Sequence, residues 1–178
     1  RPGTTANFIK LARPTVGDVA FSGHNLVWKA PSNINTAVYT PTYEVYYPSG
    51  IVYNGEKNGT SMDVSELEGG KSYTFLIKAI GNGTNYINSE KSEPITIYKL
   101  ASPEVRRDKP VYIWDSVSGA VSYAVYVDGK LEATYTHQTG KTYEFKPAFK
   151  DLKPHTVEVL AIGDNGYSTL DSKPTVII

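Results

Sequence analysis

The stretch Ser72-Tyr-Thr-Phe-Leu-Ile-Lys-Ala-Ile-Gly81 decides the fold. Its side chains alternate, and the mostly apolar set on one face comprises Tyr73, Phe75, Ile77 and Ala79. The other face carries Thr74, Leu76 and Lys78. Because successive side chains of a β-strand point to opposite faces, this period of two predicts a strand with one buried face.

A second stretch repeats this pattern. Its alternating residues are His155, Val157, Val159 and Ala161, and it also ends in Ala-Ile-Gly. The two stretches stand 82 residues apart in a chain of 178 residues, which indicates two copies of one module. A module of about 85 residues is large enough to bury a core of its own.

Each half of the chain contains about seven short alternating stretches separated by turn signals. Asp128-Gly129 predicts a type I′ hairpin turn, and further turns are expected at Pro48-Ser49-Gly50 and Asp164-Asn165-Gly166. No segment keeps a helical period of 3.6 residues. We therefore predict an all-β chain of two tandem seven-stranded β-sandwiches.

Several residues of this pattern resemble the fibronectin type III family. They are Trp28 in the second strand, Tyr43-Glu-Val-Tyr46 in the third, Leu67 before the sixth and Tyr73 at its start. The resemblance covers residues 12–99 as module 1 and residues 100–178 as module 2. It implies that both are immunoglobulin-like sandwiches and that Tyr73 is the corner tyrosine, whose hydroxyl bonds the upstream backbone.

The second module departs from the family at this corner. Leu152-Lys-Pro-His155 is three residues shorter than the stretch from Leu67 to Tyr73, and it places a histidine where tyrosine is expected. A histidine could donate one hydrogen bond from the same corner. Residues 118–129 resemble modules of bacterial secreted and surface proteins, so the resemblance implies an extracellular or cell-surface location.

Residues 1–11 precede the first module and allow two interpretations. Phe8-Ile-Lys-Leu-Ala-Arg-Pro14 resembles Ile97-Tyr-Lys-Leu-Ala-Ser-Pro103, which joins the two modules. Residues 1–11 are therefore either the end of a preceding module or a lead-in whose match is a coincidence. The junction at residues 98–103 is short and lacks glycine, which predicts a semi-rigid, elongated pair of modules.

Composition excludes several classes of protein. The chain has 18 basic and 18 acidic side chains, so we expect no nucleic-acid partner held by bulk charge. It has no cysteine, and no run of 18 apolar residues that would insert into a membrane. The chain begins with Arg1 rather than methionine and shows no signal-peptide pattern, and we expect a fragment or a processed product.

The sequence predicts no catalytic, cofactor-binding or metal site, and we expect no enzyme activity. The three histidines, His24, His137 and His155, are spread over both halves without neighbouring carboxylates in a ligand spacing. Scattered carboxylates such as Asp63 and Asp115 match no calcium loop. They are best interpreted as solvated loop charges.

Two candidate binding surfaces emerge from the pattern. Leu76 faces outward on the sixth strand and Tyr46 on its neighbour, and the second module repeats them as Tyr126 and Leu160. These side chains form a docking patch, lie under a partner module, or merely pair across strands. The long polar loop Ala30 to Pro41 is the second candidate, because loops at the end of a sandwich carry recognition in related folds.

The predicted function is that of a non-catalytic spacer and interaction region in a larger extracellular bacterial protein. Its partners would be other domains of the parent chain and a protein or glycan ligand, and we expect a monomer. The alternative is a dedicated carbohydrate-binding module. Its platform would be made of exposed tyrosines, for which the candidates are Tyr46, Tyr53, Tyr126 and Tyr135.

Overall fold

The computed structural model describes residues 3, 7–15, 19–22, 24–47, 52–164 and 168–178. For residues 19–22 and 52–57 it describes the backbone alone. The turn expected at Pro48-Ser49-Gly50 lies outside the described residues, as do Asn165 and Gly166 of the turn expected after the second repeat. The chain divides into two compact units, Arg1–Asp63 with Tyr73–Thr96, and Val64–Ser72 with Ile97–Ile178. The module boundary at residue 99 stays a prediction.

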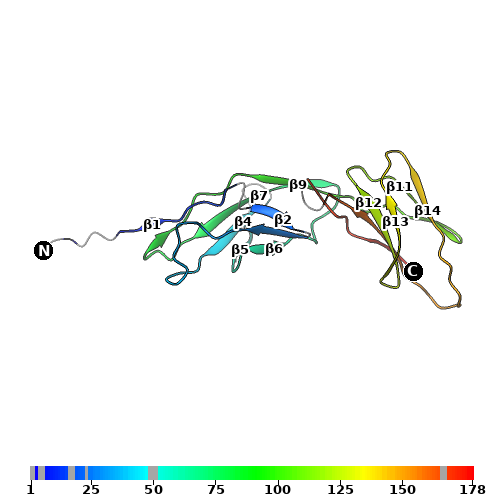
Figure 1. The fold of residues 1–178 in the computed structure, drawn as a ribbon, viewed down its shortest axis with the longest axis horizontal. Coiled ribbons are helices and arrows are strands. Elements are labelled where there is room, and N and C mark those ends of the chain that lie inside the picture. The colour runs from blue at the N-terminus through cyan, green and yellow to red at the C-terminus, as the bar shows by residue number, and fades with distance from the viewer. Residues whose placement is uncertain (1–2, 4–6, 16–18, 23, 48–51, 165–167) are drawn as a thin grey trace. The chain divides into compact units, whose positions relative to one another are not determined.

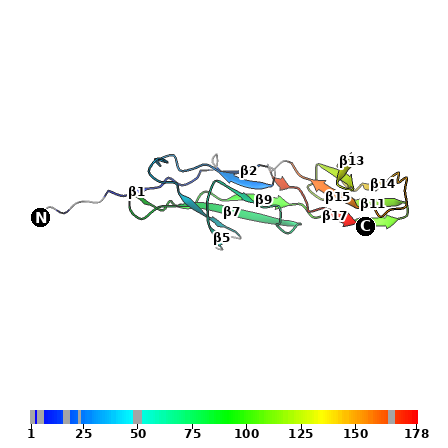
Figure 2. The same ribbon diagram turned by 90° about the horizontal axis from the view of Figure 1, so that it is seen from below.

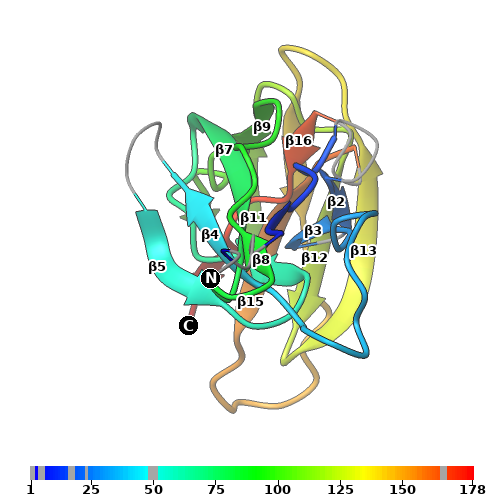
Figure 3. The ribbon, with the colours of Figure 1, turned by 90° about the vertical axis from the view of Figure 1, so that its left-hand side faces the viewer.

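The first unit is a β-sandwich of two sheets (Figures 1 and 3). One sheet has the order β9-β7-β4-β5, which are Ile95–Lys99, Lys71–Ile80, Thr42–Tyr46 and Val52–Lys57. The division into units crosses two of these strands, so Lys71 and Ser72 of β7 and residues 97–99 of β9 are counted with the second unit. The other has the order β2-β3-β6, which are Val19–Ser22, Asn25–Trp28 and Ser61–Asp63. Two short strands, Ile9–Lys10 (β1) and Tyr86–Ile87 (β8), pair in parallel beside them.

The second unit has the same topology (Figure 2). One sheet has the order β13-β12-β15-β17, which are Lys130–Thr136, Ser122–Val127, Val157–Ile162 and Thr175–Ile177. The other has the order β10-β11-β14, which are Arg106–Asp108, Val111–Asp115 and Thr142–Phe145. Thr169–Leu170 (β16) pairs in parallel with Tyr98 and Lys99 at the end of β9. The described residues therefore form two immunoglobulin-like sandwiches, as predicted.

Strand β7 confirms the alternation that decided the fold. All four residues expected on its inner face are buried, whereas Leu76 and Lys78 are half-buried. Burial of each large apolar side chain stabilises the sandwich by about 1.5–3 kcal/mol. In the second unit Val157, Val159 and Ala161 are fully buried in the same way.

The core of the second unit is built around aromatic rings. Trp114 stacks on Tyr143 with centroids 5.7 Å apart, and Tyr123 lies 4.7 Å from Tyr143. Leu100 belongs to the same buried cluster. The described residues of both units contain no helix that could cross a membrane.

Two predictions about the second repeat are wrong. Strand β15 begins at Val157, so His155 precedes the strand and lies half-buried instead of on its core face. Leu152, the expected counterpart of the buried Leu67, is fully exposed. The segment between β14 and β15, residues 146–156, is longer than residues 64–70 between β6 and β7, and Leu152 lies in this longer loop. By contrast, Asp128 and Gly129 have φ values of 50° and 78°, which confirms the type I′ turn.

Candidate functional site

Tyr46 and Leu76 are direct cross-strand partners in the first unit, as the phase of the strands predicted. Tyr46 is nevertheless only 9% exposed. Nζ of Lys91 lies 3.8 Å from the centre of its ring, and its hydroxyl donates to a carboxylate oxygen of Glu44. The hydrogen bond to Glu44 raises the pKa of Tyr46 to about 12, with smaller contributions from burial and from the Glu44 charge. Tyr46 is therefore a covered ring and leaves Leu76 as the more open member of the pair.

The second pair does not repeat the first. Tyr126 lies opposite Glu158, and Leu160 lies opposite Ala124. Tyr126 and Leu160 are both half-buried and share one sheet face, but they stand two residues apart along the ladder. We expected Tyr126 and Leu160 to lie opposite each other as Tyr46 and Leu76 do, and this prediction is wrong because the strand register places other residues opposite them. Strand phase fixes which face a residue occupies, whereas the partner opposite it depends on loop lengths.

The other candidate tyrosines give no open platform among the described side chains. Tyr135 packs edge-on against Trp114 with centroids 5.3 Å apart, and its hydroxyl donates to the backbone oxygen of Glu144 at 2.9 Å. Burial raises the pKa of Tyr135. The side chain of Tyr53 lies outside the described residues.

The long loop at residues 30–41 holds other parts of the first unit together. Asn33 accepts from the backbone N–H of Ala12 and donates to the backbone oxygen of Lys10, both at 2.8 Å. Tyr39 stacks on Tyr86 with centroids 6.0 Å apart. These contacts give the loop a structural role, and its most exposed large apolar side chain is Val38.

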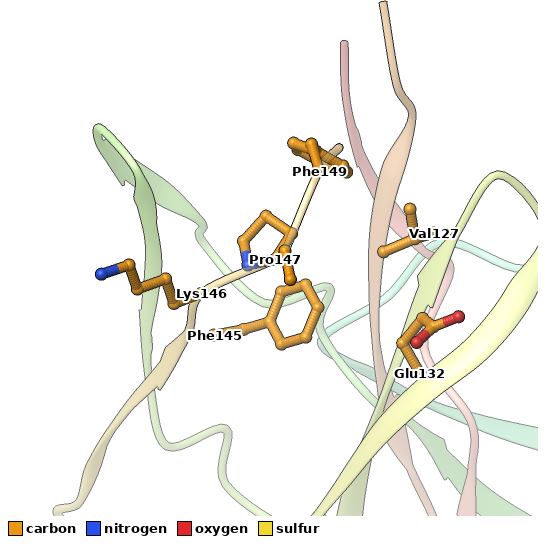
Figure 4. A pocket seen from close by; sticks show the side chains of 7 residues that line it. Val127, Glu132, Phe145, Lys146, Pro147 and Phe149 are labelled. Carbon is orange, nitrogen blue, oxygen red and sulfur yellow. The ribbon is translucent and has the colours of Figure 1, made fainter. Parts of the chain in front are cut away.

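A hollow that sequence reasoning missed lies at the open edge of the second sandwich (Figure 4). Its volume is about 320 Å³, at the lower end of the range of small-ligand sites. Phe145, Pro147 and Phe149 line one side and Val127 and Glu132 the other (Figure 4). The signal in the sequence is Phe145-Lys-Pro-Ala-Phe149, two aromatic rings around a proline directly after a strand.

A histidine held between two carboxylates lies beside this hollow. Nδ1 of His155 lies 2.7 Å from Oδ2 of Asp128, and Nε2 lies 2.9 Å from Oδ1 of Asp151. Because an ionised carboxylate only accepts, hydrogen bonds at both ring nitrogens require the protonated, imidazolium form of His155. The ring of Phe149 stacks on it, with centroids 4.1 Å apart and planes inclined by 4°. We call His155, Asp128 and Asp151 the His155 latch.

The latch shifts the pKa of each of its members. Hydrogen bonds to Asp128 and then to Asp151 raise the pKa of His155. The bond to His155 and the backbone N–H of Thr156 lower the pKa of Asp128. The pKa of Asp151 is lowered first by the backbone N–H of Lys153 and then by His155. The latch ties the loop that carries Phe149 to the hairpin turn at Asp128.

His137 makes a contact inside the second sandwich rather than at an open site. Nδ1 of His137 lies 2.9 Å from the hydroxyl of Tyr123, which also accepts from the backbone N–H of Val117 at 2.7 Å. Within the part of the chain that the structure describes, no group of three histidine, aspartate or glutamate side chains could hold a metal ion. The geometry therefore offers surfaces and hollows, the one at Phe145 to Phe149 among them, as candidates for binding.

No family model matches this sequence, and no curated protein matches it. Similar solved structures include the FN1–FN3 domains of chicken CNTN1, with 14% identity, a TM-score of 0.37, and coverage of 97% of this chain and 67% of that one. The central fibronectin-III array of RIM-binding protein has 14% identity and a TM-score of 0.33, covering 93% and 63%. A two-domain fibronectin type III segment of chicken tenascin has 20% identity and a TM-score of 0.34, covering 92% and 97%. These similarities are too distant to say anything of function.

Proposed function

We propose that this chain is a non-catalytic spacer and interaction region of a larger extracellular bacterial protein, where it presents neighbouring domains. The observation that carries the proposal is a parallel strand pairing that occurs in both units, which we call the joint. In the first unit, β1 pairs in parallel with β8, and in the second the end of β9 pairs in parallel with β16. A chain whose units each receive the preceding segment in the same way suits serial arrangement between other domains.

The use of titratable groups supports this proposal. The net charge of zero gives no electrostatic preference for a strongly charged partner. His137 bonds the hydroxyl of Tyr123, and His155 bonds the latch carboxylates. Contact with a protein or glycan through Leu76, Tyr126 or Leu160 belongs to the same proposal. The buried Tyr46, and the half-buried Tyr135 whose hydroxyl bonds the backbone oxygen of Glu144, argue against the alternative of a dedicated carbohydrate-binding module with a tyrosine platform.

An exchange of modules in the parent protein tests the proposal. Residues 8–178 are replaced by two unrelated β-sandwich modules of equal length, and a flexible Gly/Ser linker serves as the control. We expect the sandwich replacement to keep the activity of the neighbouring domains and the linker to lower it. Loss of activity with both replacements, together with a turnover signal from the isolated chain, would contradict a non-catalytic spacer.

A further inference from the structure

The two joints match hydrogen bond for hydrogen bond. In the first tail, residues 8–11, the N–H groups of Ile9 and Leu11 donate to the oxygens of Asn85 and Ile87 at 2.8 and 3.1 Å. In the second tail, residues 97–100, the N–H groups of Tyr98 and Leu100 donate to the oxygens of Ser168 and Leu170, both at 3.0 Å. Phe8 is therefore the counterpart of Ile97, and Ile87 is the counterpart of Leu170.

Matched positions differ sharply in exposure. Phe8 is 51% and Ile87 43% exposed, whereas Ile97 and Leu170 are each 1% exposed. The side chain of Lys10 is 53% exposed, and its counterpart Lys99 is buried. An open hollow beside the first tail is lined by Lys10, Ile87 and Glu90 among others. The first tail thus presents an apolar surface whose counterpart is covered in the second unit.

The cover in the second unit includes the loop at residues 66–70. The N–H of Gly70 donates to the backbone oxygen of Lys99 at 2.8 Å. A Cβ atom on Gly69 would lie 2.6 Å from the backbone oxygen of Leu100, so only glycine allows this approach. The carboxylate of Glu66 pairs with Nζ of Lys173 at 2.9 Å.

We propose that the first tail and Ile87 form a docking site for a glycine-containing loop of another module, one that precedes this chain in its parent protein. The inference rests on the proposed function, because it requires a chain of serial modules. The occupant is a loop built like residues 66–70, seated on Phe8, Ile9 and Ile87. It would close the first unit as residues 66–70 close the second tail.

Charge complementarity specifies the occupant further. Ser89 and Ser172 match, since their hydroxyls accept from the backbone N–H groups of the equivalent residues Ala79 and Ala161, at 2.9 and 3.0 Å. The residue after Ser172 is Lys173, which binds Glu66, and the residue after Ser89 is Glu90. Glu90 pairs with Lys10 at the exposed surface. The occupant therefore carries a basic residue at the place of Glu66.

A second copy of this chain does not fit the site. Its only Gly-Gly pair is Gly69-Gly70, which already lies against Lys99 and Leu100. The loop at residues 146–155, which precedes β15 as residues 64–70 precede β7, contains no glycine. It cannot make the close backbone approach that Gly69 makes.

An extended chain tests the docking site. A copy of residues 12–96 is joined directly ahead of Phe8, with Glu66→Lys in the added copy to match Glu90. A soluble paramagnetic reagent then reports the exposure of Phe8 and Ile87 by NMR, with Ile97 and Leu170 as internal references. We expect the relaxation of Phe8 and Ile87 to fall at least threefold relative to the original chain, and Gly69→Val in the added copy to restore it. Unchanged relaxation beside a folded added copy would overturn the proposal.

Reading the parent chain ahead of Arg1 gives a second test that needs no folding. Gly70 precedes Ile97 by 27 positions, so the occupant's glycine is expected about 27 residues before Phe8. A parent chain without glycine in that region would overturn the proposal. If the sandwich replacement keeps the activity of the neighbouring domains but no docking is seen, this inference alone is overturned. If docking is seen but the sandwich replacement loses that activity, only the spacer function is overturned.

Discussion

His155 carries a charge at a position where the first unit has a buried phenol. Tyr73 is buried, and its ring lies 5.1 Å from that of Tyr47. His155 instead lies between Asp128 and Asp151 under the ring of Phe149. A histidine in place of tyrosine, together with a longer loop before the strand, thus turns an aromatic corner into a charged latch.

The latch predicts a pH-dependent second unit. The pKa of His155 is raised, so its stabilisation is complete below the unfolded value of about 6.5 and is lost as pH rises through the folded value. The pKa values of Asp128 and Asp151 are lowered, so their stabilisation is complete above about 3.9 and is lost at more acidic pH. The latch is therefore expected to contribute most between about pH 4 and 6.5.

The variant His155→Gln should remove the alkaline part of this profile. Thermal midpoints measured from pH 5 to 9 are expected to decline for the original chain and to stay flatter for the variant. Lys150 and Lys153 lie on the same loop in both chains, so they do not account for a difference between the two profiles. Parallel profiles for the two chains would mean that His155 does not latch the loop.

Leu67 and Leu152 should respond differently to truncation. Leu67 is buried and Leu152 is fully exposed. Leu67→Ala is expected to lower the free energy of unfolding by about 2–3 kcal/mol, because it leaves a cavity. Leu152→Ala is expected to change it by less than about 0.5 kcal/mol. Urea unfolding of both variants measures the difference, and equal losses would contradict the two environments.

At the scale of elements, the loops before β8 and β16 are organised by one side chain each. Oδ1 of Asn82 accepts from the N–H groups of Thr84, Asn85 and Tyr86 at 2.9–3.0 Å. Oδ1 of Asp164 accepts from the N–H groups of Ser168 and Thr169 at 2.9 and 2.8 Å. Each loop leads into the strand that receives a tail, and it supplies one of the two carbonyl groups that do so, Asn85 in the first unit and Ser168 in the second.

The difference between these two side chains predicts that the loop before β16 is sensitive to acid in a way that the loop before β8 is not. Burial alone would raise the pKa of Asp164, but hydrogen bonds from Ser168 and Thr169 lower it to about 2. Its stabilisation is therefore complete above about 3.9 and is lost as pH falls toward 2. Asp164→Asn should cost under about 1 kcal/mol at pH 7 and remove this acid dependence.

The measurement is urea unfolding at pH 2.5 and pH 7, read from amide signals of β12 and β15. Asn82 is the natural control, because an amide already performs the same task in the first unit. If the free energy of unfolding of the variant still falls as much between pH 7 and pH 2.5, carboxylates other than Asp164 cause the loss.

The sequence predicted elements better than it predicted surfaces. The alternation in β7 and the turn at Asp128-Gly129 are local, so the residues themselves specify them. The cover of Tyr46 by Lys91 joins residues 45 positions apart, and nothing in the local pattern signals it. The register that separates Tyr126 from Leu160 likewise depends on loop lengths rather than on phase.

At the scale of the molecule, the chain is one topology used twice with different details. Within the described residues each unit combines a larger sheet, β9-β7-β4-β5 or β13-β12-β15-β17, with a sheet of three strands, and β16 pairs with the end of β9. The match between residues 8–14 and 97–103 in sequence corresponds to the same parallel pairing in each unit, so the resemblance of these segments is structural. A chain assembled this way can be lengthened by adding units, as a spacer requires.

Amide hydrogen exchange of the unmodified chain tests this account most directly. The amides of Ile9 and Leu11 in the first tail, and of Tyr98 and Leu100 in the second, each donate to a backbone oxygen. We expect all four to exchange on the order of ten times or more slower than in an unstructured chain. Exchange of Ile9 and Leu11 at the unstructured rate, with Tyr98 and Leu100 still protected, would show that the joint is built only once and contradict the account.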